Sequence, residues 1–193
     1  MVLHNGAQAR ENRETFLKMR FVKQVEKFLL EKKKYGTESG MIAVMAMSSV
    51  YLPGELPKLS IDDGLSKHVV ETLNKTLSSV DSAYNNWTTR KLVSGIANVA
   101  NCKPSAHTLT SQNILKPLLQ MLDSQDLNDK ECALNAIWSL INEVTIVTIS
   151  ANKGLTEKLQ ELSGATVDAS VRQAVLRVLA KLALRQRGGK HLF

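Results

Sequence analysis

Two stretches of this chain, 93 residues apart, carry the same pattern of apolar residues without a gap. The stretch Leu109–Asn142 aligns with an earlier region so that Ile114 falls on Phe21 and Trp138 falls on Met45. A single offset therefore relates two helical patterns and the break between them, which chance seldom achieves. Such repetition constrains the fold strongly, because a repeated unit buries its apolar face only by stacking on its neighbours.

Within Leu109–Asn142 the sequence predicts two helices separated by a polar turn. The first helix shows apolar residues at helical spacing, namely Ile114, Leu115, Leu118, Leu119 and Leu122. The segment from Asp123 to Asp129 then interrupts the pattern with short polar side chains that compete for backbone hydrogen bonds. The second helix, over Ala133–Asn142, is apolar on most of its surface, so it has to be covered by protein on several sides.

A second pairing, at an offset of 83 residues, relates Leu92–Ala100 to Val175–Ala183. Together the pairings indicate four units within a single domain that spans residues 1–193. The units are expected near residues 10–52, 64–101, 107–143 and 154–185, and their starts lie about 49, 44 and 46 residues apart, as in repeats of two or three helices. Both ends of the chain match the middle of a unit. Partial repeats are therefore expected there, as in a fragment of a longer solenoid or a module capped by a partner.

The rest of the chain is expected to alternate between helices and loops. Further helices are predicted over Phe21–Leu29, Met41–Tyr51, Leu65–Leu77, Thr88–Ala100, Leu155–Leu162 and Val171–Leu184, with loops at Lys32–Gly36, Ser78–Asn86 and Pro53–Gly64. The β-branched run over residues 143–150 is the one place where a strand competes, and we interpret it as a helix end followed by a loop. Asp168 or Ser170 is expected to cap the last helix.

The composition favours an all-α protein in a reducing compartment. Aromatic residues make up 5% of the chain, and four prolines and ten glycines leave long stretches uninterrupted. Cys102 and Cys132 each lie beside apolar helix residues, which indicates free thiols. The sequence shows neither a signal peptide nor an apolar window of membrane-spanning length, so a cytoplasmic location is expected, with the nucleus as an alternative.

The formal net charge of +7 is distributed unevenly along the chain. Seven basic residues lie within Lys18–Lys34, and Arg172–Lys190 has six basic residues and no acidic one. Basic ends predict a partner of acidic character. The run formed by Lys32, Lys33 and Lys34 is expected in a solvated loop, and the sharper alternative is an electrostatic contact with tubulin tails, nucleic acid or anionic lipid.

The patterns that usually carry catalysis or cofactor binding are absent from the sequence. The acidic segment that begins at Asp123 has Asn128 and Leu134 where a calcium-binding EF-hand loop requires Gly and Glu. The four histidines lie in different units without metal-ligand spacing, and there is no glycine-rich phosphate loop or nucleophile elbow. We therefore expect a protein that is not an enzyme and that holds no metal or cofactor.

The segment Ala136–Asn142, with the sequence AIWSLIN, resembles the third helix of an armadillo repeat. In that family the helix carries a Trp and, four residues later, an Asn, and both face a concave groove. The resemblance implies a right-handed α-solenoid of about four armadillo-like repeats. An Asn amide can donate to and accept from the main chain of an extended peptide, and a Trp on the same helix face provides a wall for side chains.

The resemblance assigns groove positions in each unit. The Asn of the family corresponds to Asn5, Ser49, Asn98, Asn142 and Lys181, and its Trp corresponds to Met45, Ser94, Trp138 and Arg177. Because only the third unit keeps both residues, the groove is neutral to basic, which disfavours a receptor for basic nuclear signals such as the importin-α-like proteins. Two interpretations of Trp138 remain, a groove residue or a core residue between stacked helices.

Two functions fit these observations. The first is a non-catalytic scaffold that binds an extended or helical segment of another protein. Arg177 and Lys181 would select acidic side chains of that segment. A phrase that recurs in Val2–Leu29 and Leu92–Leu122 also resembles armadillo-like repeats of centriole and basal-body proteins, which implies a role in centriole or cilium assembly and a location at the centrosome. The alternative is a nucleic-acid-binding helical-repeat protein, favoured by the net charge of +7 and disfavoured by the scarcity of aromatic residues.

Overall fold

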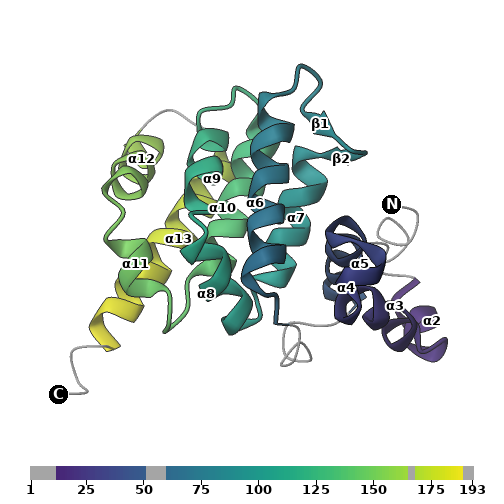
Figure 1. Ribbon diagram of the computed structural model, residues 1–193. Helices are drawn as coiled ribbons and strands as arrows, with labels where there is room; N and C mark the ends of the chain where they lie inside the picture. Colours follow the sequence, from purple (N-terminus) through teal and green to yellow (C-terminus); the bar gives the residue numbers. More distant parts are fainter. Residues whose placement is uncertain (1–11, 51–59, 165–167, 189–193) are drawn as a thin grey trace.

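The structure, a computed structural model, describes residues 12–50, 60–164 and 168–188. Within these segments it contains twelve helices and one two-stranded hairpin (Figure 1). The prediction of an all-α protein is confirmed. In the described segments no helix is both long enough and apolar enough to cross a membrane.

The helices follow one another from one end of the molecule to the other (Figure 1). The first group comprises α2 (Arg13–Lys18), α3 (Phe21–Leu30), α4 (Lys32–Tyr35) and α5 (Thr37–Val50). The middle comprises α6 (Asp63–Ser78), β1 (Ala83–Tyr84), β2 (Trp87–Thr88), α7 (Thr89–Val99), α8 (Lys103–Ser111), α9 (Leu115–Leu122) and α10 (Leu127–Leu140). The last group comprises α11 (Ile146–Ser150), α12 (Lys153–Gly164) and α13 (Ala169–Gly188).

Two layers of helices build the stack. In the first layer α5 contacts α7, α7 contacts α10, and α10 contacts α13. Each of these helices also packs on an earlier helix of the second layer, which places α3 on α5, α6 on α7, α9 on α10 and α12 on α13. The second layer is continuous from α6 through α9 to α12. The four helix pairs lie within residues 21–50, 63–99, 115–140 and 153–188.

One apolar core runs through the whole stack, from Phe21 in α3 to Leu182 in α13. The stripe predicted for α9 supplies part of it, since Ile114, Leu115, Leu118 and Leu122 are buried and Leu119 is half-buried. Removing such side chains from water is the main stabilising contribution to a helical stack, because each layer covers the apolar side of the next.

The hairpin between α6 and α7 was not predicted, since this segment reads as a plain loop in the sequence. Asn85 and Asn86 form the turn with φ values of 49° and 65°, a left-handed conformation that Asn tolerates better than most residues. Trp87, on β2, is fully buried, and its Nε1 donates to Glu38 Oε1 of α5 at 2.9 Å. The second carboxylate oxygen of Glu38 lies 2.9 Å from His68 Nε2 on α6. Glu38 therefore ties the hairpin and α6 to α5.

Three local expectations are corrected or refined by the structure. The solvated loop expected at Lys32–Gly36 is the short helix α4, and Gly36, with a φ of +83°, separates it from α5. The run after α10 is neither strand nor loop, because residues 146–150 form α11. Asp168 caps α13 as expected, since its carboxylate accepts from the Ser170 backbone N–H at 2.8 Å. The loop expected at Pro53–Gly64 lies largely outside the described residues, as do the partial repeats expected at the two ends of the chain.

Candidate functional site

Three helices of the first layer, α7, α10 and α13, share one polar face. Arg90, at the start of α7, pairs with Asp126 and Asp129 at the start of α10. Further along, α13 contacts α10 through two successive pairs whose members advance in the same direction along both helices. We group these polar residues with Ser94 and Asn98, which follow Arg90 at helical spacing on α7. We call this surface the α7–α10–α13 face and define it by Arg90, Ser94, Asn98, Asn135, Trp138, Arg177 and Lys181.

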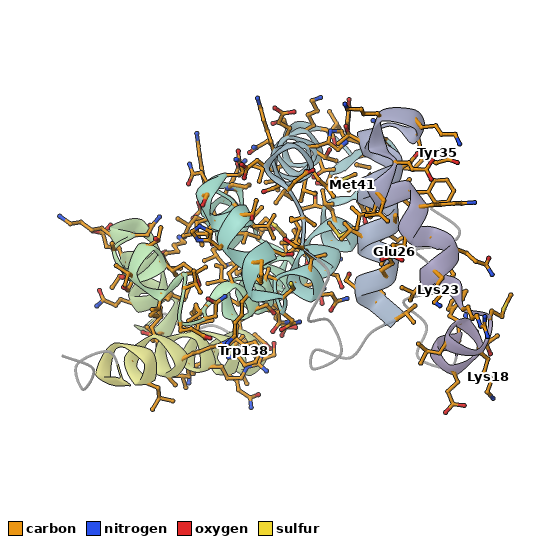
Figure 2. All side chains as sticks on the ribbon, turned by 60° about the horizontal axis from the view of Figure 1, so that its bottom comes forward. Lys18, Lys23, Glu26, Tyr35, Met41 and Trp138 are labelled. Atoms are coloured by element: carbon orange, nitrogen blue, oxygen red, sulfur yellow. The ribbon has the colours of Figure 1, made fainter. Side chains whose placement is uncertain are left out.

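Trp138 lies at the surface where α10 meets α13 (Figure 2). Its side chain is 41% exposed, and the Lys181 ammonium lies 3.7 Å from the centre of the indole ring. The same ammonium donates to the Trp138 carbonyl oxygen at 2.7 Å. A cation above an exposed aromatic ring contributes about 0.5–1 kcal/mol. Trp138 is therefore not enclosed in the core, and its place in a ligand groove stays a prediction.

Arg177 lies one helical turn before Lys181 on the same side of α13. Its guanidinium donates to the Asn135 side-chain oxygen of α10 at 2.8 Å, and the Arg177 side chain stays exposed. The two cations thus form a short basic row beside Trp138. Such a row can bind carboxylates, because a guanidinium offers several further N–H donors.

The α7 part of the face comes from residues at helical spacing. Arg90, Ser94 and Asn98 lie four residues apart and so point to one side of the helix. Ser94 is exposed and Asn98 is half-buried. Sequence reasoning identified Ser94 and Asn98 but missed Arg90 and Asn135. Helical spacing alone could have found both, since Arg90 lies four residues before Ser94 and Asn135 lies three residues before Trp138.

Met45 is a correction to the predicted groove. The resemblance places it at the Trp position of the first unit, but its side chain is 1% exposed and packs between α5 and α7. Gly95 of α7 makes room for it, because a methyl group at Gly95 would overlap the Met45 sulfur. Ser49 is half-buried, and its hydroxyl donates to the Met45 carbonyl oxygen at 2.9 Å. The first unit therefore offers no Met45 contact to a ligand.

Asn142 is also a correction, since its amide serves the fold and is buried. The side-chain oxygen accepts from the Val144 backbone N–H at 2.8 Å and from the Thr145 backbone N–H at 3.2 Å. The side-chain nitrogen donates to the Leu140 carbonyl oxygen at 3.3 Å. Asn142 thus closes the turn after α10, and both the oxygen and the nitrogen of its buried amide bond to that turn.

The remaining predicted residues lie elsewhere or outside the described part of the chain. Asn5 falls outside the described residues. Lys32 lies in α4, and nothing is described of its side chain, whereas Lys33 and Lys34 are exposed on the same helix. Lys34 lies 3.6 Å from Glu31. Figure 2 shows this end of the molecule, marked by Lys18, far from Trp138. The basic run therefore belongs to a surface separate from the α7–α10–α13 face.

The electrostatics of the face centre on the start of α10. The Asn128 backbone N–H, followed by Arg90, holds the pKa of the Asp126 carboxyl below its usual value. Hydrogen bonding to Asp129 raises the pKa of Arg90, which stays charged in any case. Burial raises the pKa of the nearby Cys132 thiol, so this free cysteine stays protonated at neutral pH and reacts slowly.

The side chains of the face define which chemical groups it can contact. Among the described residues, no group of three His, Cys, Asp or Glu side chains is arranged to hold a metal ion. The polar groups of the face are guanidinium, ammonium, amide and hydroxyl groups around one indole. These groups bind carboxylates, amides and apolar side chains, which are the groups that a protein segment presents.

Comparison with known proteins informs the fold alone. No protein-family model matches the sequence, and no curated protein matches it. A crystal structure of an engineered protein from the Northeast Structural Genomics Consortium is similar, with a TM-score of 0.62 and 18% sequence identity, over 95% of this chain and 71% of that one. At this identity the likeness supports the arrangement of helices and carries no information on function.

Proposed function

We propose that this protein is a non-catalytic scaffold whose α7–α10–α13 face binds a segment of another protein. The observation that carries the proposal is Trp138, an exposed indole that lies under the Lys181 ammonium. A large exposed aromatic side chain beside cations is typical of the anchors that dominate protein interfaces, because it buries much area and loses little conformational entropy.

The proposed ligand is an extended or helical segment with acidic side chains. An apolar residue of the segment would pack on Trp138, and its carboxylates would bind Arg177 and Lys181. Asn98 and Ser94 would bond to main-chain groups of the segment, as the armadillo resemblance implies. Because Met45 and Asn142 are buried, the binding surface is shorter than the sequence predicted and is centred on α10 and α13.

The wider setting rests on the sequence resemblance. We propose that the two layers of helices form a right-handed armadillo-like α-solenoid whose concave side is the α7–α10–α13 face. The recurring phrases resemble the C-terminal repeats of rotatin, a protein of centrioles and ciliary basal bodies. The proposed role is therefore assembly of centrioles or cilia, in the cytoplasm and at the centrosome. The stacked helices support this proposal only as an all-α arrangement, which the similar engineered protein shares.

The test compares proteins captured by the wild type and by surface variants. Trp138→Ala and Arg177→Glu/Lys181→Glu change the face, and Lys116→Glu on the exposed side of α9 is the matched control. A photo-reactive residue placed at position 94 then identifies which segment of a captured protein lies against the face. We expect a partner that is retained by the wild type and the control, is lost with both face variants, and crosslinks from position 94.

Melting curves separate binding from stability in this test. Trp138→Ala should lower the melting temperature by only a few degrees, since part of the ring is already in water and its contact with Lys181 contributes about 0.5–1 kcal/mol. If every captured protein is retained by both face variants, the proposed site is wrong. If Trp138→Ala chiefly lowers the melting temperature, the ring has a structural role and the anchor has to be sought elsewhere.

A second function, nucleic-acid binding, is favoured by one observation at the other end of the molecule. Exposed lysines gather on α2 to α4, namely Lys18, Lys23, Lys27, Lys33 and Lys34. A basic surface that binds phosphates gives an affinity that falls steeply with salt. The test measures binding to a single-stranded oligonucleotide. Two results together would favour this function over the scaffold: the affinity falls steeply from low to physiological salt, and Lys23→Glu/Lys27→Glu abolishes binding.

A further inference from the structure

The last helix of the first layer, α13, carries an apolar stripe that no described element covers. Leu176 is 54% exposed and Leu184 is 71% exposed. Ala180 and Ala183 are exposed between them. These positions follow the spacing i, i+4, i+7 and i+8, so all four side chains lie on one side of the helix. We call these four residues the α13 stripe.

The α13 stripe is separate from the other two sides of the helix. The core side of α13 buries Val171, Val175 and Val178. The side that faces α10 carries Arg177 and Lys181, which belong to the α7–α10–α13 face. The stripe is thus an additional surface that borders the α7–α10–α13 face on the same helix.

The architecture of the stack indicates what kind of element fits the α13 stripe. Within the first layer, α7 is covered by α5 and α10, and α10 is covered by α7 and α13. Among the described helices of this layer, α13 contacts α10 alone. Its outer side therefore repeats a surface that elsewhere in the molecule receives a helix. Short α11 lies beside α13 (Figure 1), and its Val147 is 75% exposed.

Charge restricts the occupant further. The sequence of α13 has five basic residues and no acidic one. Neighbouring α11 has no charged residue. On α12 Glu157 is exposed, and the Glu161 carboxylate is paired with Lys158 at 2.9 Å. Arg172 lies exposed beside the stripe. The apolar surface is thus flanked mainly by cations.

We propose that the α13 stripe binds an amphipathic helix of another protein whose apolar side is flanked by acidic residues. Leu176 and Leu184 would pack against the apolar side of the incoming helix, and Arg172 would pair with its carboxylates. A second copy of this chain fits less well. At the opposite end of the molecule the exposed apolar residues Met19 and Leu30 lie among basic side chains, so two like-charged surfaces would meet.

The experiment uses two designed peptides of about 21 residues, a length that reaches measurable helicity in water. Both carry Leu at helical spacing, and one has Glu and the other Lys at the flanking positions. Each peptide carries a fluorescent label, and its binding to the full chain is measured by fluorescence anisotropy. The variants are Leu176→Asp/Leu184→Asp and, as a matched control on an exposed apolar residue elsewhere, Val80→Asp.

We expect the Glu peptide to bind the wild type and Val80→Asp equally, and to bind Leu176→Asp/Leu184→Asp at least about tenfold more weakly. The Lys peptide should bind all forms weakly. Trp138→Ala should not alter binding of the Glu peptide, which separates this surface from the scaffold face. If the double substitution lowers the melting temperature, Leu184→Asp alone replaces it, because this residue lies close to the end of α13. A clear loss of Glu-peptide binding is expected for this single variant as well.

Three results would overturn the proposal. The first is a Glu peptide that fails to bind the wild type or that binds it no better than the Lys peptide. The second is equal binding to the wild type and to Leu184→Asp. The third is self-association of the wild type that is abolished by Leu176→Asp/Leu184→Asp, which would make a second copy of this chain the occupant of the stripe.

Discussion

The α5–α7 contact and the α10–α13 contact use the same repeat position and have opposite character. In the first contact Met45 is enclosed between the helices, and Gly95 of α7 leaves the space that its side chain fills. In the second contact Trp138 occupies the equivalent position, yet it lies at the surface under the Lys181 ammonium. One contact is dry and apolar, and the other is bridged by cations.

The difference shows that a repeat position does not determine its own environment. The residue on the next helix decides it. A glycine on the neighbour lets the helices enclose a flexible side chain such as Met45, because no Cβ stands in the way. A lysine on the neighbour brings a charge that has to stay near water, so the contact keeps an open edge. Function at this repeat position is therefore expected only where the neighbour is polar.

The largest expected effect concerns the dry contact. Met45→Ala should lower the free energy of unfolding by about 2–5 kcal/mol, because it leaves a cavity in a packed interior. Gly95→Ala should also destabilise the wild type by overpacking, by about 1–3 kcal/mol. In the Met45→Ala background the same substitution should become stabilising by up to about 1 kcal/mol, because the space is free and Ala favours helix.

Urea unfolding of the wild type, both single variants and the double variant measures this coupling. Additive effects of Met45→Ala and Gly95→Ala would contradict the contact between the two residues. The sign change is the sharp criterion, since a general loss of stability cannot produce it.

The next effect concerns Glu38, which joins α5 to the hairpin. Glu38→Ala removes the carboxylate that accepts from the buried Trp87 indole N–H, and should cost about 1–3 kcal/mol. Glu38→Gln is the matched control, because its amide oxygen still accepts that hydrogen bond, and a smaller loss is expected. Equal losses for the two variants in urea unfolding would mean that the charge toward His68 matters more than the bond to Trp87.

A smaller effect is expected at the polar contact. Lys181→Met removes the cation above Trp138 and should cost about 0.5–1 kcal/mol, since the pair is partly in water. The chain has two tryptophans, so Trp87→Phe leaves Trp138 as the single fluorophore. In that background Lys181→Ala should increase quenching by acrylamide, because the lysine no longer covers the ring. Unchanged quenching would show that Lys181 does not lie over Trp138 in solution.

The smallest effect is expected at the exposed start of α10, and it depends on pH. The Asn128 backbone N–H and Arg90 lower the folded-state pKa of Asp126 below its usual value. The wild type should therefore be more stable than Asp126→Asn at neutral pH. This advantage persists down to about pH 4, the ordinary pKa of an aspartate, and is lost as the pH falls through the lower folded-state pKa. Urea midpoints of both proteins between pH 7 and pH 3 measure the difference, and a constant gap would contradict this assignment.

Local patterns were sufficient to predict much of the fold. The apolar spacing of α9 predicted its buried side, and the alignment at 93 residues matched the helix pairs α3 with α5 and α9 with α10. The hairpin was missed because its turn depends on two Asn residues in a left-handed conformation, and its position depends on Trp87 reaching Glu38 from a distant segment. Tertiary contacts of this kind leave no periodic signal in the sequence.

The candidate face was predicted only in part, again because some of its residues depend on tertiary contacts. The resemblance to armadillo repeats selected Arg177 and Lys181 on α13, and Ser94 and Asn98 on α7. The members of each pair lie four residues apart and so on one side of their helix. Spacing could not show that Asn142 would be used to close the turn after α10, because this depends on where the chain bends next.

By itself the sequence determined that the protein is all-α and which side of each helix is buried. Both follow from the period of the apolar residues, which is a local property of the chain. The tertiary structure alone decided which of the equivalent repeat positions remained at the surface. Exposure depends on the residue that the neighbouring helix brings, and Met45 met a glycine whereas Trp138 met a lysine.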